Sequence, residues 1–182
     1  MTPEGLAWVA LEQPATHDEA PLAAPARWLG AHAPSSEWRM HRDVLARRPE
    51  VGAVVHAHAP AATALACLPD VQQAGIPAFH YMIAIAGGDD LRCAPYATFG
   101  SAALSAHAVT ALDGRTACLL AHHGILALGA TPSAALDVAI EVETLAQMYV
   151  HARAAGAPAV LDAAEMARVR ERFARYRQAG RD

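Results

Sequence analysis

Two histidines separated by a single residue, His56 and His58, stand in an apolar stretch that contains two adjacent valines. Residues two apart on a β-strand point to the same face of a sheet, so both imidazoles could bind one metal ion. A third ligand could come from His122 or His123, which precede Gly124 far along the chain. Three histidines and an open coordination position are typical of catalytic zinc. The pair could equally fill a polar corner of the core, and the spacing alone leaves both interpretations open.

A carboxylate that could act as an acid or a base beside such a metal belongs to Glu37. We expect a serine-capped helix over residues 34–48, directly before the strand that carries His56. At the start of this helix, Ser35 and Ser36 offer hydroxyl and backbone N–H groups to an anion such as phosphate. Glu37 could instead only stabilise the helix dipole, and the serines could be an ordinary cap.

The elements that must position these residues alternate between strands and helices. Strands are expected at residues 51–57, 76–81, 116–121 and 125–128, with a short strand that ends at Pro95. Further helices are expected at residues 60–67, 101–112, 133–154 and about 163–178. Residues 1–34 indicate a short strand or turn and then a loop-rich connector. The alternation predicts an α/β protein built as a three-layer α/β/α sandwich.

The composition narrows the class of protein. A chain of 182 residues with 54% hydrophobic and 18% charged residues predicts a single domain over residues 1–182. A net charge of -4 offers no basic surface for nucleic acid. Three widely spaced cysteines argue against a disulfide framework and favour a reducing cytoplasm. We expect neither an export leader nor a membrane span.

Five stretches carry the motifs of one known family: residues 34–39, 54–58, 76–84, 93–100 and 122–124. Together they resemble the class II aldolase/adducin family and, within it, the L-fuculose-1-phosphate aldolases. The resemblance runs from Thr2 to near the C-terminus. It implies a central sheet that is mixed and largely antiparallel.

The resemblance also implies the metal ligands and the chemistry. In that family the His-x-His pair and the histidine directly before glycine bind zinc, which implies His56, His58 and His123 rather than His122, with one Zn²⁺ per subunit. Glu37 is implied both as a further ligand and as the group that moves a proton. Zinc would stabilise an enediolate as a Lewis acid. The implied reaction is reversible cleavage of a ketose 1-phosphate, such as L-fuculose 1-phosphate, into dihydroxyacetone phosphate and L-lactaldehyde.

A homotetramer with active sites between subunits is implied as well. Tyr81 from a neighbouring subunit would exchange a proton with the aldehyde-derived oxygen. Phe173 and Tyr176 would reach over a neighbour's site, although by spacing alone they are an i, i+3 pair on an amphipathic helix. Phe99 is expected at the substrate site, with simple packing as the alternative, and Tyr81 could likewise pack in the core.

At its N-terminus, this chain differs from the members of that family. Family members begin with an additional helix and a Gly-Asn loop that supplies much of the phosphate cradle, whereas this chain starts at the turn from Thr2 to Gly5 that follows them. Either the start codon is assigned too late or the fold is N-terminally shortened, and in the second case phosphate binding is left to Gly5, Ser35 and Ser36.

Two other interpretations stay open at this point. The first is a related enzyme, either a pentulose-phosphate 4-epimerase or a sugar-acid phosphate decarboxylase; the epimerases carry an aspartate where Glu37 stands. The second is a non-catalytic assembly module like the adducin head domain. That interpretation predicts that the zinc ligands are lost, whereas all three histidines are present.

Overall fold

The core of the protein is a four-stranded mixed sheet with the strand order β1-β6-β5-β4. The computed structural model describes residues 6–11 and 27–179, with side chains as far as Arg175. The strands are β1 (Ala53–Ala57), β4 (Cys93–Ala94), β5 (Ala117–Leu120) and β6 (Gly124–Gly129). β6 pairs antiparallel with both β1 and β5, and β5 pairs parallel with β4. The predicted mixed, largely antiparallel sheet is thus confirmed.

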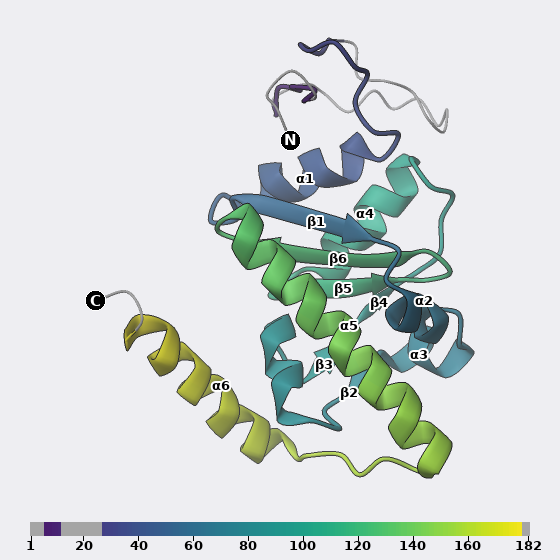
Figure 1. Ribbon diagram of the computed structural model, residues 1–182, viewed down its shortest axis with the longest axis vertical. Helices are drawn as coiled ribbons and strands as arrows, with labels where there is room; N and C mark the ends of the chain where they lie inside the picture. The colour runs from purple at the N-terminus through teal and green to yellow at the C-terminus, as the bar shows by residue number, and fades with distance from the viewer. Residues whose placement is uncertain (1–5, 12–26, 180–182) are drawn as a thin grey trace.

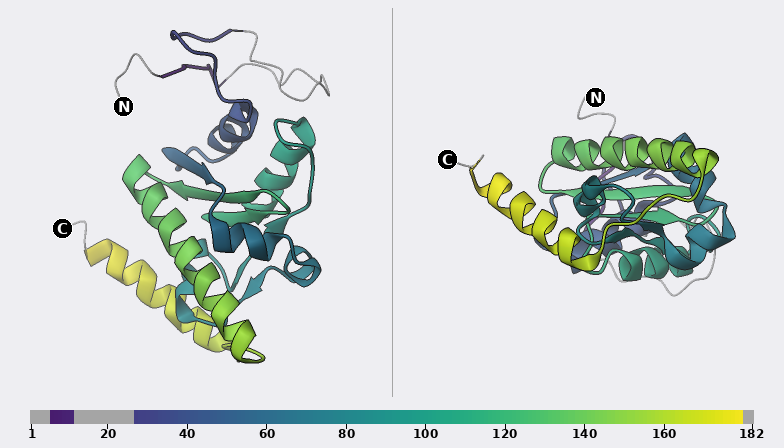
Figure 2. Two further views of the ribbon diagram at one scale, coloured as in Figure 1. Left: turned by 45° about the vertical axis from the view of Figure 1, so that its right-hand side comes forward. Right: turned by 90° about the horizontal axis from the view of Figure 1, so that it is seen from below.

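Helices cover both faces of this sheet (Figures 1 and 2). On one face lie α2 (Pro60–Ala66) and α5 (Pro132–Ala155), and on the other lie α1 (Trp38–Arg47) and α4 (Ala102–Ala111). Successive residues of β6 point to opposite faces of the sheet. Ile125 packs in the core under α2 and α5, while Leu126 packs in the core under α1 and α4. This period of two is the pattern of a strand that is buried on both sides. The three-layer sandwich predicted from the sequence is therefore confirmed.

The long helices begin at residues that the sequence marks as caps. Ser101 accepts a hydrogen bond from the backbone N–H of Leu104 at the start of α4, with 3.1 Å between the atoms. Thr131 does the same for α5, whose first residue is Pro132. A hydroxyl at the N-cap and proline at the first helical position both favour helix initiation. These boundaries agree with the sequence to within one or two residues.

The strand predicted over residues 76–81 is wrong in its second half. Only β2 (Ile76–Pro77) is extended, and it pairs with β3 (Asp90–Leu91) in a separate two-stranded sheet. The chain then turns at His80, whose Nδ1 accepts from the backbone N–H of Met82, into the short 3-10 helix η2 (Tyr81–Ala86). Such local side-chain hydrogen bonds compete with strand pairing.

Two further helices complete the described chain. α3 (Pro69–Ala74), which the sequence analysis missed, begins with proline and ends at Gly75, whose φ of +73° favours glycine. α6 (Ala163–Ala179) follows α5 and extends outward from the rest of the molecule (Figure 1). In the described part of the chain, no helix is long and apolar enough to cross a membrane.

Candidate active site

The register of β1 against β6 brings three histidines together. Ala57 at the end of β1 pairs with Ile125 near the start of β6, so His58, one residue beyond β1, lies beside the turn that holds His123. The ring centroids of His56, His58 and His123 are 4.8 to 5.1 Å apart. The glycine after His123 permits this approach, because a Cβ atom on Gly124 would lie 2.4 Å from the carbonyl oxygen of Ala57.

Glu37 completes the group. Its carboxylate oxygens lie 2.9 Å from Nε2 of His56 and 3.2 Å from Nε2 of His123. Among the described residues it makes no side-chain cap hydrogen bond, although it occupies the N-cap position of α1. The expected serine cap is therefore wrong: in the described part of the chain, Ser35 Oγ accepts from the backbone N–H of Glu37, outside the helix. Because its carboxylate is not used as a cap, Glu37 faces the histidines.

These four residues, Glu37, His56, His58 and His123, form one cluster, in which one potential ligand atom from each lies within 4.8 Å of the others. His122 stays outside the cluster, because its left-handed backbone (φ +56°) directs the two adjacent histidines to different places. The residues expected as metal ligands are thus the ones that the fold brings together.

The protonation pattern of the cluster suits a metal ion. Nδ1 of His56 lies 2.9 Å from the carbonyl oxygen of Ile125, to which it donates, so in the neutral ring Nε2 carries the lone pair and faces Glu37. Neither this Nε2 nor Oε1 of Glu37, both buried, has a hydrogen-bond partner among the described residues. Nε2 of His56 also lies 2.9 Å from Oε2 of the same carboxylate, and two electron-rich atoms this close repel each other unless a cation lies between them. Three imidazole nitrogens and a carboxylate are a donor set that zinc accepts.

Burial favours the neutral form of two histidines of this region, His123 and His41. It lowers the pKa of His123, an effect that the Glu37 carboxylate opposes and that His56 and His58 reinforce. It also lowers the pKa of His41, whose ring lies edge-on to that of His56 with 6.5 Å between the centroids. A histidine must be neutral to bind a metal, so this environment favours binding at neutral pH.

A cavity of about 390 Å³ opens onto the cluster. Two predicted substrate-site residues, Ser36 and Phe99, line it, whereas Ser35 does not. Two residues of the same wall were not predicted at the substrate site: His122, which the sequence offered only as a possible metal ligand, and Tyr96, which belongs to the stretch that carries Phe99 and could have been found there. The full lining consists of Ser36, Glu37, His58, Tyr96, Ala97, Phe99, His122 and His123.

Tyr81 and Phe173 lie elsewhere in the same protomer. Both line a second hollow of about 840 Å³ between η2 and α6, which shares no lining residue with the cavity at Glu37 in the described structure. Tyr81 is half exposed, so the core-packing alternative is wrong for this residue. Tyr176 is on α6, but its side chain lies outside the described residues, as does all of Gly5.

The family of the chain follows from this fold and from sequence comparison. Residues 1–150 match the family described as the class II aldolase and adducin N-terminal domain. The chain therefore belongs to the class II aldolase/adducin family, and the metal-ligand cluster is in keeping with the metal dependence typical of class II aldolases.

Particular relatives within the family are enzymes. The chain is 51% identical over 176 residues to the 5-methylthioribulose-1-phosphate/5-deoxyribulose-1-phosphate aldolase of Rhodospirillum rubrum, covering 97% of this chain and 76% of the relative. It is 49% identical over 144 residues to the L-fuculose phosphate aldolase of Escherichia coli (strain K12), covering 79% of this chain and 65% of the relative. A solved L-fuculose 1-phosphate aldolase matches with a TM-score of 0.73 and 43% identity over 79% of this chain and 66% of its own length. The chain thus spans slightly less than two thirds of these fuculose aldolases.

Proposed function

We propose that the protein is a zinc-dependent aldolase that reversibly cleaves a ketose 1-phosphate into dihydroxyacetone phosphate and an aldehyde. L-Fuculose 1-phosphate, which yields L-lactaldehyde, is the substrate that we favour. The observation that carries the proposal is the contact of the Glu37 carboxylate with His56 and His123 in the wall of a cavity. A non-catalytic assembly module would have no need of this ligand set.

The reaction requires a proton to leave one oxygen and another to reach a carbon. Bound Zn²⁺ supplies a Lewis acid for the negative charge that develops on the substrate oxygens. When the hydroxyl at C4 loses its proton, the bond between C3 and C4 breaks, the aldehyde departs and the electron pair remains on the dihydroxyacetone phosphate half. Glu37, at the cavity wall, then delivers a proton to C3, and in the reverse direction it removes that proton.

Two groups hold the other parts of the substrate in this proposal. Ser36 lines the cavity just before α1, and with Ser35 it offers hydroxyl and N–H groups to the phosphate. The side chain of Phe99, which is half exposed, supplies an apolar surface on the same cavity.

We further propose that Tyr81 acts in the site of a neighbouring subunit of a homotetramer. It is exposed, and it lines a hollow with Phe173 rather than the cavity at Glu37. A half-exposed tyrosine that is absent from the cavity of its own protomer is free to enter that of another. Tyr81 would exchange the proton of the hydroxyl at C4, and Phe173 with Tyr176 would cover the substrate.

A second class of substrate, with a different aldehyde half, is also a candidate. The relative from Rhodospirillum rubrum is named for 5-methylthioribulose 1-phosphate and 5-deoxyribulose 1-phosphate. Both are ketose 1-phosphates that release dihydroxyacetone phosphate, and they differ from L-fuculose 1-phosphate in the aldehyde. The apolar surface of Tyr96, Ala97 and Phe99 suits the methyl or methylthio end that these substrates carry.

The test is release of dihydroxyacetone phosphate by purified, zinc-loaded protein. L-Fuculose 1-phosphate and 5-deoxyribulose 1-phosphate are compared in a coupled assay that reduces this product, and chelator-treated protein is the control. We expect cleavage that disappears with the metal and returns with zinc. Interconversion of pentulose 5-phosphates without release of a three-carbon product would instead establish the epimerase alternative.

A further inference from the structure

His122 has an unusual backbone that the surrounding structure holds in place. Its φ of +56° is the one positive value among the described residues other than glycine. Its backbone N–H donates to the carbonyl oxygen of Ala66 at 3.2 Å, and the next N–H, of His123, donates to Leu120 at 3.0 Å. A side chain in this conformation is uncommon and persists where neighbouring contacts enforce it. The result is a ring that faces the cavity without belonging to the metal-ligand cluster.

Gln72 on α3 fixes which nitrogen of this ring carries the proton. Its Nε2 donates to the carbonyl oxygen of Ala66 at 2.9 Å, and because a carbonyl only accepts, the nitrogen end of the amide must face this way. The same Nε2 lies 2.8 Å from Nε2 of His122, which must therefore accept its second hydrogen. The proton of the neutral His122 ring is consequently on Nδ1.

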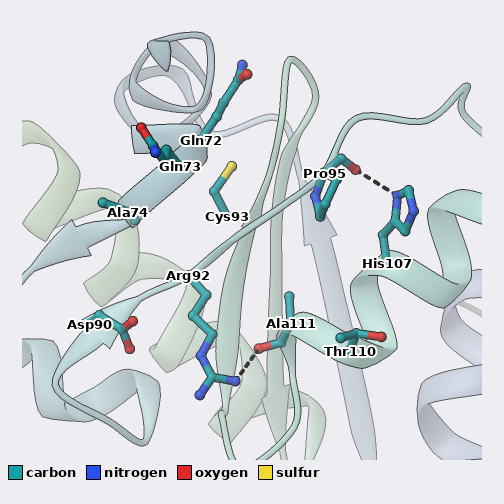
Figure 3. Close-up of a pocket in the computed structure, with 11 residues that line it drawn as sticks. Gln72, Gln73, Ala74, Asp90, Arg92, Cys93, Pro95, His107, Thr110 and Ala111 are labelled. Atoms are coloured by element: carbon teal, nitrogen blue, oxygen red, sulfur yellow. Dashed lines mark hydrogen bonds between the residues drawn. The ribbon is translucent and has the colours of Figure 1, made fainter. Parts of the chain in front are cut away.

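The position of Gln72 agrees with a supporting role. It borders a separate hollow of about 420 Å³ beside Cys93, but its side chain extends away from Cys93 (Figure 3). The Nε2 group of its amide donates hydrogen bonds to Ala66 and His122, and Gln72 is not among the residues that line the cavity at Glu37. Among the described contacts of Gln72, the one that reaches that cavity is the hydrogen bond to His122.

His122 is exposed at the cavity wall, and its Nδ1–H group makes no hydrogen bond to another described residue. The ring lines the cavity and meets Tyr96 edge-on, with 5.9 Å between the centroids and 82° between the planes. A fixed donor at a cavity wall suits an oxygen atom of the ligand. Because Ser35 and Ser36 are assigned to the phosphate and the cluster to the enediolate oxygens, the oxygen that remains belongs to the aldehyde half.

We propose that His122 determines specificity by donating a hydrogen bond from Nδ1 to the hydroxyl beside the carbonyl of the aldehyde, and that Gln72 is its positioning residue. This inference rests on the proposed aldolase function. A site that bonds a substrate hydroxyl discriminates against the analogue that lacks it, because the bound analogue displaces water from the donor without pairing with it.

The test compares two aldehydes in the addition direction, each with dihydroxyacetone phosphate. L-Lactaldehyde has the hydroxyl and propanal lacks it. We expect the zinc-loaded protein to favour L-lactaldehyde in kcat/KM by roughly tenfold, the scale of one neutral hydrogen bond. Two variants distinguish the roles of the two ring nitrogens. His122→Asn keeps a donor near the Nδ1 position and tolerates a positive φ, whereas His122→Gln keeps only the contact with Gln72.

The preference for L-lactaldehyde should persist in His122→Asn and fall to about equality in His122→Gln. It should also fall severalfold in Gln72→Leu, while Gln73→Leu is the matched control on the same helix and should leave it unchanged. An unaltered preference in His122→Gln would overturn the inference. If the parent protein adds neither aldehyde, the proposed function fails and the inference fails with it.

A second measurement does not depend on activity or on the folding of the His122 variants. Nitrogen-15 NMR of histidine-labelled, zinc-loaded protein distinguishes the two neutral tautomers, and the His122 resonances can be assigned through their loss in His122→Asn or through backbone assignment. We expect a protonated Nδ1 and an unprotonated Nε2 in the parent and in Gln73→Leu, and loss of this single form in Gln72→Leu. A parent protein with the proton on Nε2 would contradict the inference.

Discussion

Nε2 of His56 and Oε2 of Glu37 lie 2.9 Å apart, although the carbonyl oxygen of Ile125 holds the proton of this imidazole on the opposite nitrogen. In the neutral ring two lone pairs therefore meet, and Nε2 of His56 is buried away from water that could screen them. A cation between them would turn this repulsion into attraction. The contact is the strongest reason to expect a metal in the cluster.

The first prediction is that zinc stabilises the fold. A ligand that binds only the folded state adds about 2.7 kcal/mol to the free energy of unfolding at a hundred times its Kd, which for a domain of this size raises Tm by roughly 5 to 10 °C. Thermal unfolding of chelator-treated protein with and without zinc measures the effect. Magnesium at the same concentration is the control, and equal Tm values for the zinc-loaded and metal-free protein would contradict the prediction.

The second prediction concerns the two adjacent histidines. His123→Ala should lose most of the bound zinc, as should His56→Ala and His58→Ala, because each removes one of the four potential ligands. His122→Ala should keep about one zinc per chain, since its ring lies outside the cluster. Metal analysis after dialysis reports the stoichiometry. The reverse outcome, with zinc retained in His123→Ala and lost in His122→Ala, is incompatible with the structure of this turn.

The third prediction is that inactive subunits complement each other. We expect light scattering to show about four chains per particle and both Tyr81→Phe and His123→Ala to be nearly inactive alone. When the two variants are unfolded and refolded together, a mixed tetramer contains sites with a normal cluster from one chain and a normal Tyr81 from its neighbour. Part of the activity should then return. The double variant, refolded in the same way, is the control, and failure of any mixture to regain activity would place the two residues in one subunit's site.

The fourth prediction follows from the burial of the thiols. All three cysteines are free; Cys67 is exposed, Cys93 is partly buried and Cys118 is buried. Burial raises the pKa of Cys93 to about 11, and the nearby Cys67 adds to this, while burial also raises the pKa of Cys118. Because the thiolate is the reactive form, Cys93 should react about tenfold faster for each unit of pH between 7 and 10.

Mass spectrometry of peptides after brief treatment with iodoacetamide measures this reactivity. At pH 7.5 we expect the label mainly on Cys67, with Cys118 unlabelled as long as the protein stays folded. Denatured protein, in which all three thiols are accessible, provides the control. Rapid labelling of Cys93 at neutral pH would contradict the burial seen in the structure.

The sequence was sufficient to predict the layers and the histidine cluster, because both depend on local periodicity and on a specific motif. The apolar run with two adjacent valines predicted the strand of His56, and periodic apolar residues predicted the helices over residues 101–112 and 133–154. That His123 rather than His122 joins the cluster was predicted from the resemblance. In physical terms it depends on the positive φ of His122 and on the register of β1 against β6, which no local pattern specifies.

Other features depend on contacts that are distant in the chain. The turn after β2 is set by the side chain of His80, which competes with strand pairing. Gln72 and His122 are 50 residues apart, so their hydrogen bond has no signature in the spacing of either residue. The separation of Tyr81 from the cavity at Glu37 likewise appears only when η2 and α6 are placed in space.

The most direct test of the proposed function is the activity of Glu37→Gln in protein loaded with zinc. Glutamine keeps the size of the side chain but cannot act as a base, and loss of a positioned acid or base lowers a rate by about 10²- to 10⁴-fold. We predict that the variant folds, holds zinc through the three histidines, and loses both cleavage of L-fuculose 1-phosphate and exchange of the dihydroxyacetone phosphate proton with solvent. Cleavage and exchange at the parent rate in a zinc-loaded Glu37→Gln protein would contradict the account.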